Sequence, residues 1–159
     1  MMSVTKVSVS LPFGLGQLEW RPDTVQQIAA WQIYVELVTR ISVQELADDE
    51  GLSREALSSL YSLFGTTRDV LKNAGPKAGL SERSLGWVAI EVLNKGLRPF
   101  LAKWHPMLKD WEDARPGDVS QRDHEAHWPH QSEFRGALTT LRGELSTYAN
   151  ALKEIAKAR

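Results

Sequence analysis

Residues 132–157 read SEFRGALTTLRGELSTYANALKEIAK, and this stretch decides the fold. Its apolar residues recur at alternating spacings of four and three, at Phe134, Leu138, Leu141, Leu145, Tyr148, Leu152 and Ile155. Such a heptad pattern predicts a long amphipathic helix. Because the apolar stripe is narrow, the helix either lies in the groove of a helical bundle or pairs with a partner helix.

A second helix is predicted from Asp23 to about residue 41. Asp23 can accept a hydrogen bond at the helix start, and Gln26 stands three residues later, as in a capping box. The apolar face of this helix is wide, which predicts that neighbours cover it on two sides. Trp31 lies on that face, so we expect it in the core.

Two more helical patterns follow, at residues 52–73 and from Ser81 onward. Pro99 lies within the last of these and removes a backbone donor, so we expect a kink there. Pro106 is expected to begin a separate short helix. Residues 114–131 are the least regular part of the chain and are expected to form a long connection.

The N-terminal residues have the alternation of a β-hairpin over residues 4–20. Apolar residues alternate with polar ones, and two glycines stand where the chain would turn. Together these patterns predict a mainly α fold, a four-helix bundle with a kinked third helix and a small N-terminal β-hairpin. We expect a single domain over residues 1–159, with the bundle at 23–157.

Composition excludes several kinds of protein. The chain has 159 residues, a formal net charge of -1 and no cysteine. The absence of cysteine removes disulfides, thiolate catalysis and cysteine-based metal sites. The balanced charge disfavours a dedicated nucleic-acid binder. No apolar segment is long enough for a membrane span or a signal-peptide core, so we expect a cytoplasmic protein. We also expect no cofactor.

Three histidines raise the question of a metal site. His124, His127 and His130 are spaced three apart, and residues at that spacing share a helix face. The sequence differs from the zinc motif HExxH, because Trp128 stands where the second histidine would be. A polar surface loop is therefore the preferred interpretation, with zinc binding as the weaker alternative.

Arg122 and His127 carry a resemblance to a known family. Four residues separate them, and this spacing resembles the Rx4–6H motif of HEPN ribonucleases. Those proteins are all-helical, commonly dimeric, and cut RNA without metal. The resemblance implies that Arg122 would stabilise phosphate charge and that His127 would act as a general acid or base. The surrounding sequence is not basic, which weakens this hypothesis.

Six tryptophans are a high content for this length. Trp104 and Trp111 are seven apart near the expected kink, beside Arg98, Lys103 and Lys109. Interfaces favour tryptophan and arginine, so this region is a candidate surface for a protein partner or a second copy of the chain. We expect one of the two tryptophans to be substantially exposed. The alternative is that both cover the end of the bundle.

Two stretches resemble uncharacterised bacterial helical proteins of unknown function. They are LYSLF at residues 60–64 and VLNKGLRPFLAKWHP at residues 92–106, and the resemblance covers most of residues 18–155. It implies membership of a multi-component bacterial system. It implies no activity, and it assigns no catalytic residue to this chain.

The sequence therefore favours a non-enzymatic protein-interaction module, acting as a subunit or adaptor. This prediction depends on the absence of nucleotide-binding and hydrolase motifs, the tryptophan content and the heptad helix. The first alternative is the metal-independent ribonuclease using Arg122 and His127. The second alternative is a helical sensor that binds a small molecule in the bundle.

Overall fold

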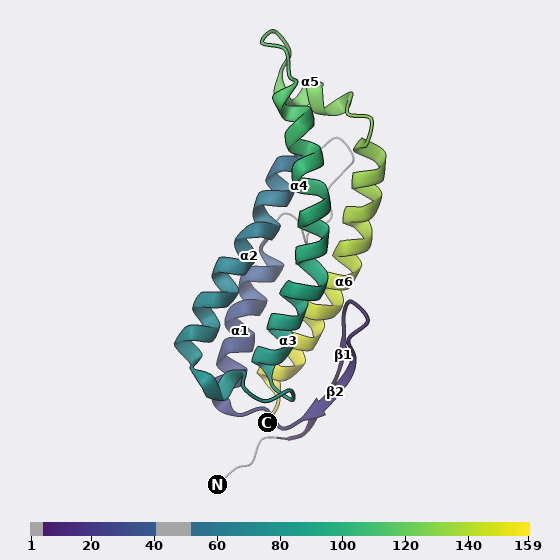
Figure 1. Ribbon diagram of the computed structural model, residues 1–159. Coiled ribbons are helices and arrows are strands. Elements are labelled where there is room, and N and C mark those ends of the chain that lie inside the picture. The colour runs from purple at the N-terminus through teal and green to yellow at the C-terminus, as the bar shows by residue number, and fades with distance from the viewer. Residues whose placement is uncertain (1–4, 41–51) are drawn as a thin grey trace.

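The computed structural model describes residues 5–40 and 52–159, and four helical rods dominate it. They are α1 (Thr24–Val38), α2 (Ser53–Ala74), α3 (Leu85–Glu91) with α4 (Arg98–Asp113), and α6 (Gln131–Lys157). The rods alternate in direction and share one hydrophobic cluster (Figure 1). A short helix, α5 (Gln121–Ala126), lies at the far end from the chain termini. The predicted mainly α fold with a hairpin is confirmed.

The heptad helix α6 packs its apolar stripe into the core of the bundle. All seven heptad positions of α6 are buried, from Phe134 to Ile155. Of the two arrangements that the sequence left open, α6 therefore lies in the groove of its own bundle. Its main helical neighbour is α1, and β1 (Val7–Leu11) packs against it as well.

The N-terminal hairpin pairs β1 with β2 (Gly16–Trp20) in antiparallel register, from Val7 opposite Trp20 to Leu11 opposite Gly16. Alternate β1 residues are buried, which is the pattern of a strand with one face on a core. Figure 1 shows the hairpin beside the lower half of α6. Because a two-stranded hairpin is marginal alone, this packing stabilises it.

The third rod changes its winding just before Pro99. Residues Val92–Leu97 form a π-helical segment, η2, and the Arg98 N–H donates to the Leu93 carbonyl five residues earlier. The wider turn accommodates a proline that cannot donate at position 99. Where the sequence predicted a kink of the helix axis, the structure shows a π-helical turn that precedes the proline.

Pro106 does not begin a new helix, so that expectation was wrong. α4 continues through Pro106 to Asp113. Pro106 and Ala102 are both exposed, and Ala102 carries the carbonyl that Pro106 leaves without a helical donor. Water can satisfy that carbonyl, which lets the helix run on at a smaller cost than in a core.

The hairpin tip is held between two rods. The Phe13 N–H donates to Glu144 Oε2 of α6 at 2.6 Å. The Phe13 ring lies on Gly96 of η2, where an added Cβ would come within 2.3 Å of ring atom Cε2. Only glycine permits this close approach, so the hairpin tip packs directly against the backbone of η2.

Asp23 begins α1 as predicted, since its Oδ1 accepts from the Gln26 N–H at 2.8 Å. The Gln26 side chain does not complete a capping box. It is buried instead, and its Oε1 accepts from Trp20 Nε1 at 2.9 Å and from the Leu85 N–H at 3.0 Å. α1 ends at Val38 with Thr39 as its C-cap, before the predicted end at residue 41, which lies outside the described residues.

Candidate functional site

The outer face of α1 is apolar and exposed. Four side chains along it keep much of their surface open, namely Val25 at 36%, Ile28 at 54%, Trp31 at 56% and Val35 at 39%. The opposite face of α1 is buried and includes Ala29, Ala30, Ile33 and Leu37. The expectation that Trp31 is a core residue was therefore wrong, because α2 and α6 cover only the other face of this helix.

No charged residue occurs in α1 from Thr24 to Val35. The Trp31 and Tyr34 rings stack with centroids 5.7 Å apart and planes 22° apart, which fixes the indole on the surface. Surface helices usually carry charged residues on their solvent face. A contiguous exposed apolar surface on a helix is typical of an interaction site. We call the side chains of Val25, Ile28, Trp31 and Val35 the α1 face.

Trp104 does not contribute to an exposed surface. Its relative exposure is 1%, and its ring packs edge-on against Phe134 at 5.2 Å and Trp128 at 6.0 Å. Trp104 lies on the buried face of α4 together with Leu101 and Leu108. The expectation of a substantially exposed tryptophan is wrong at this position.

Trp111 is half-buried rather than open. Its ring stacks on the His124 ring at 4.3 Å, and its Nε1 donates to the His124 carbonyl at 2.7 Å. These two contacts attach α5 to the end of α4. The structure thus matches the alternative in which both tryptophans cover the bundle end.

The three basic residues predicted beside them face different neighbours. The Arg98 guanidinium lies over the Phe64 ring of α2. Lys103 lies over the Trp104 ring and near Glu133 of α6, and Lys109 pairs with Asp113 within α4. The structure therefore does not bring Arg98, Lys103 and Lys109 together as one basic rim.

Arg122 and His127, the residues of the ribonuclease hypothesis, are both exposed and lie on and just after α5. Five positions along a helix turn the side-chain direction by about 140°, so the two do not share a helix face. His127 Nδ1 lies 2.8 Å from the Asp123 carbonyl.

The three histidines have separate surroundings. His124 is buried against Trp111, while His127 and His130 are exposed. His130 lies beside Glu133, and hydrogen bonds from His130 and Lys103 lower the pKa of that carboxyl group. Within residues 5–40 and 52–159, no three His, Cys, Asp or Glu side chains gather to hold a metal ion.

A polar cluster that the sequence did not reveal joins α2 to α4. Arg54 of α2 pairs with Glu112 at 2.7 Å, and its Nη1 lies 2.7 Å from His105 Nδ1. Burial, and next the Arg54 charge, lower the pKa of His105 from its usual value of 6.5, which favours the neutral imidazole. Arg54 lies 51 positions from His105 and 58 from Glu112, so periodicity gives no sign of its contact with them.

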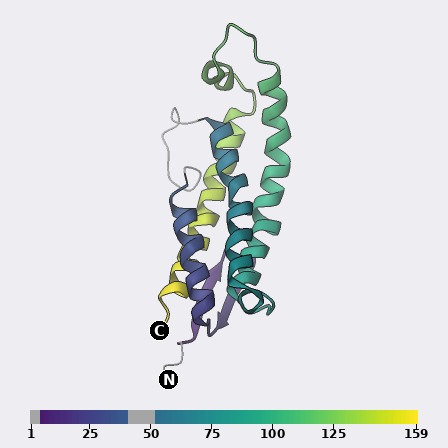
Figure 2. The same cartoon turned by 90° about the vertical axis from the view of Figure 1, so that its left-hand side faces the viewer.

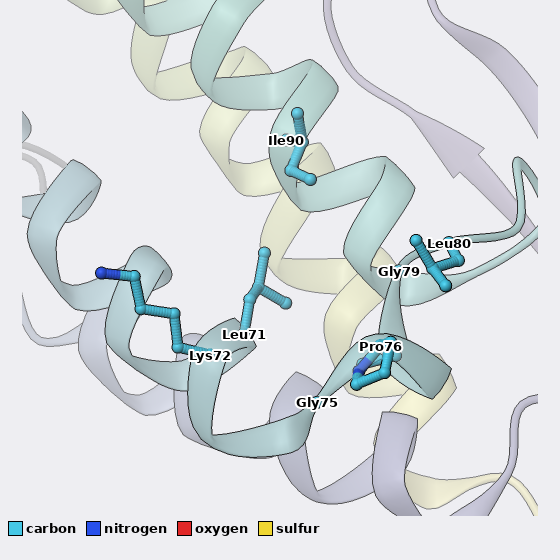
Figure 3. A pocket seen from close by; sticks show the side chains of 8 residues that line it. Leu71, Lys72, Gly75, Pro76, Gly79, Leu80 and Ile90 are labelled. Carbon is cyan, nitrogen blue, oxygen red and sulfur yellow. The ribbon is translucent and has the colours of Figure 1, made fainter.

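An apolar hollow of about 360 Å³ lies where α2 is followed by η1 (Pro76–Ala78) and α3. Figure 3 shows Leu71 and Ile90 beside it, with Leu80 across from them. A Cβ on Gly86 would lie 2.4 Å from the Gly79 Cα, so the backbones touch at its edge. Lys72 is the charged residue of its lining, and the other lining residues are apolar side chains or glycines.

Comparisons with known proteins do not place this chain in a family. No family model, no curated protein and no solved structure matches it. That result agrees with a sequence resemblance that names no activity. None of the helices in the described part of the chain combines the length and the apolar character needed to cross a membrane.

Proposed function

We propose that this protein is a non-enzymatic interaction module that works as a homodimer, joined through the α1 face. The observation that supports this is the row of exposed apolar side chains on a helix segment without charge. Burying such a row removes apolar surface from water, the main driving force of association. The histidines of the metal hypothesis, in contrast, do not gather with other ligands in the described part of the chain.

A second copy of the chain is the partner that we propose for the α1 face. The α1 face has Val25 and Val35 at its two ends, equally far from residue 30, with Ile28 and Trp31 between them. In a two-fold symmetric contact, each residue meets the partner residue at the mirrored position. An antiparallel pair of α1 helices centred near residue 30 would thus place Val25 opposite Val35.

The charges at the ends of α1 fit the same arrangement. Arg21 precedes the helix and is exposed, and Glu36 follows the uncharged segment with its side chain 47% exposed and paired with Arg40 at 2.9 Å. An antiparallel partner would bring Arg21 of one copy near Glu36 of the other, at the polar rim of the contact. Trp31 would lie near the centre, where interfaces concentrate their binding energy.

Sedimentation equilibrium tests this proposal with a matched pair of variants. We expect the unaltered protein to be dimeric, and Ile28→Glu to be monomeric but still folded, because Ile28 is exposed in the single chain. Leu80→Glu is the control, since Leu80 is 84% exposed in a loop outside α1. A monomer at about 100 μM for the unaltered protein would contradict the proposal. A dimer that survives Ile28→Glu would contradict it as well.

A further inference from the structure

A groove with two arginines lies between α2 and α4. On α2, Tyr61, Phe64 and Arg68 share one helix face, at spacings of three and four. On α4, Arg98 and His105 are seven apart and face the same space. The two faces enclose a hollow of about 280 Å³. Figure 2 shows α2 and α4 running side by side along most of their length.

Aromatic rings form one wall of this groove. Phe64 is buried, and its ring lies 6.3 Å from that of Tyr61. Tyr61 is 63% exposed, although large aromatic side chains usually bury most of their surface. The His105 ring meets the Tyr61 ring edge-on at 6.0 Å. Tyr61 thus offers a flat, open surface on which a planar group can stack.

Both guanidinium groups lie over the same ring. The Cζ atoms of Arg98 and Arg68 are 5.1 Å and 5.7 Å from the Phe64 centroid. Arg98 also makes long contacts of 3.4 Å to Asn94 Oδ1. In the described part of the chain, no carboxylate forms an ion pair with either arginine. Two like charges are therefore held close together without an opposing charge.

His105 adds a hydrogen-bond donor. Arginine can only donate, so the 2.7 Å contact makes His105 Nδ1 the acceptor of the Arg54 N–H. The neutral imidazole then carries its hydrogen on Nε2. The nearby carboxylate of Glu112 is already engaged by Arg54 at 2.7 Å. The groove therefore offers cationic and neutral donors to a ligand.

We propose that this groove binds a small anion that carries a flat ring. Its carboxylate or phosphate is held by Arg68 and Arg98, and its ring stacks on Tyr61. Guanidinium groups bind both kinds of anion through paired N–H donors. The small volume and the net charge of -1 favour a small molecule over a nucleic-acid strand. This site is formed by α2 and α4 and does not depend on the α1 face.

Nuclear magnetic resonance titration of the ¹⁵N-labelled full chain tests the site. Phenyl phosphate and phenylacetate supply a ring with each anion, while inorganic phosphate and benzyl alcohol supply one part alone. We expect saturable amide shifts at Tyr61, Phe64 and Arg98 with at least one of the two aromatic anions. Binding should be about tenfold tighter than for either part alone. Whichever aromatic anion binds more tightly identifies the anion that the site prefers.

Variants locate the binding. Arg68→Gln and Arg98→Gln should each weaken it by about tenfold, the effect of losing one charge-assisted contact. Tyr61→Leu should weaken the aromatic anions and leave inorganic phosphate unchanged. The control is Arg83→Gln, which removes the same charge from an exposed residue outside the groove.

Three results would overturn the inference. The first is the absence of saturable shifts in the groove at millimolar probe. The second is binding that Arg83→Gln weakens as much as Arg98→Gln does. The third is an oligouridylate that binds the groove far more tightly than uridine monophosphate, since that would make the ligand a nucleic-acid strand.

Discussion

Among single residues, Gln26 shows how a buried polar side chain organises this fold. Its Oε1 accepts hydrogen bonds from Trp20 of β2 and from the Leu85 N–H at the start of α3. The Leu85 N–H is one of the first amides of a helix, which have no partner within the helix itself. One buried oxygen therefore satisfies donors from two other elements and joins the hairpin to the bundle.

Gln26→Leu should lower the free energy of unfolding by about 2–6 kcal/mol. The leucine keeps the bulk of the side chain but leaves two buried donors without an acceptor, at about 1–3 kcal/mol each. Urea denaturation measures the change. Gln17→Leu, at an exposed position of β2, is the control and should change stability little. Equal effects of the two substitutions would show that Gln26 does not link the elements.

His105 should make stability depend on pH. Its pKa lies below the usual 6.5 in the folded protein, because burial and then Arg54 disfavour the charged form. Its contribution to stability is therefore fully present above about pH 6.5 and is lost as the pH falls through the lower folded pKa. Asparagine retains an acceptor for Arg54 but does not titrate.

The melting temperature between about pH 8 and about pH 5 provides the measurement. We expect the unaltered protein to lose more stability toward acid than His105→Asn does. Parallel melting curves for the two proteins across this range would show that His105 is not the residue responsible.

Among the elements, α6 depends on its heptad positions for packing against the rest of the bundle. Leu145 is fully buried. Leu145→Ala should therefore cost about 2–5 kcal/mol of stability, the range for a leucine removed from a core. Chemical denaturation measures this cost, with the exposed neighbour substitution Ser146→Ala as the control. A cost below about 1 kcal/mol would contradict the placement of this stripe in the core.

The packing of the hairpin tip against η2 is tested by a double-mutant cycle. Gly96→Ala should destabilise the protein by about 1–3 kcal/mol, because its Cβ would overlap the Phe13 ring. In a Phe13→Ala background the same change should be neutral or stabilising by up to about 1 kcal/mol, since alanine is the better helix residue. Additive effects in the cycle would mean that the ring does not lie on Gly96.

The sequence predicts elements whose signal is local. The heptad of α6, the cap at Asp23 and the alternation of β1 each depend on neighbours within a few positions, and the structure contains all three. The sequence could not show which face of α1 is covered, because apolar residues surround that helix. Trp31 was therefore placed in the core, although only the positions of α2 and α6 decide its exposure.

The groove residues illustrate the same limit. Arg68 and Arg98 meet over Phe64 only because α2 and α4 pack side by side. One local sign was present, since Tyr61, Phe64 and Arg68 share a helix face. The prediction that Pro106 begins a new helix was wrong for a similar reason. The cost of a proline inside a helix depends on whether the proline and the carbonyl four residues earlier are exposed, and the local sequence pattern does not give that exposure.

At the scale of the whole molecule, the bundle presents two separate surfaces. The α1 face is an exposed apolar strip on one rod, and the groove lies between two others. Since the residues of the two surfaces do not overlap, substitutions can test each one alone. A homodimer joined through α1 would keep both copies of the groove accessible to a ligand.

The distance between two spin labels tests the antiparallel α1 dimer most directly. The chain has no cysteine, so Thr39→Cys at the exposed end of α1 introduces one label per copy. Thr39 lies nine positions from the centre near residue 30, which gives about 27 Å between the two copies along the helix axis. Double electron–electron resonance should show a distance of about 30 Å that Ile28→Glu abolishes. The absence of dipolar coupling without that substitution, or a distance below about 15 Å as in a parallel pair, would contradict the account.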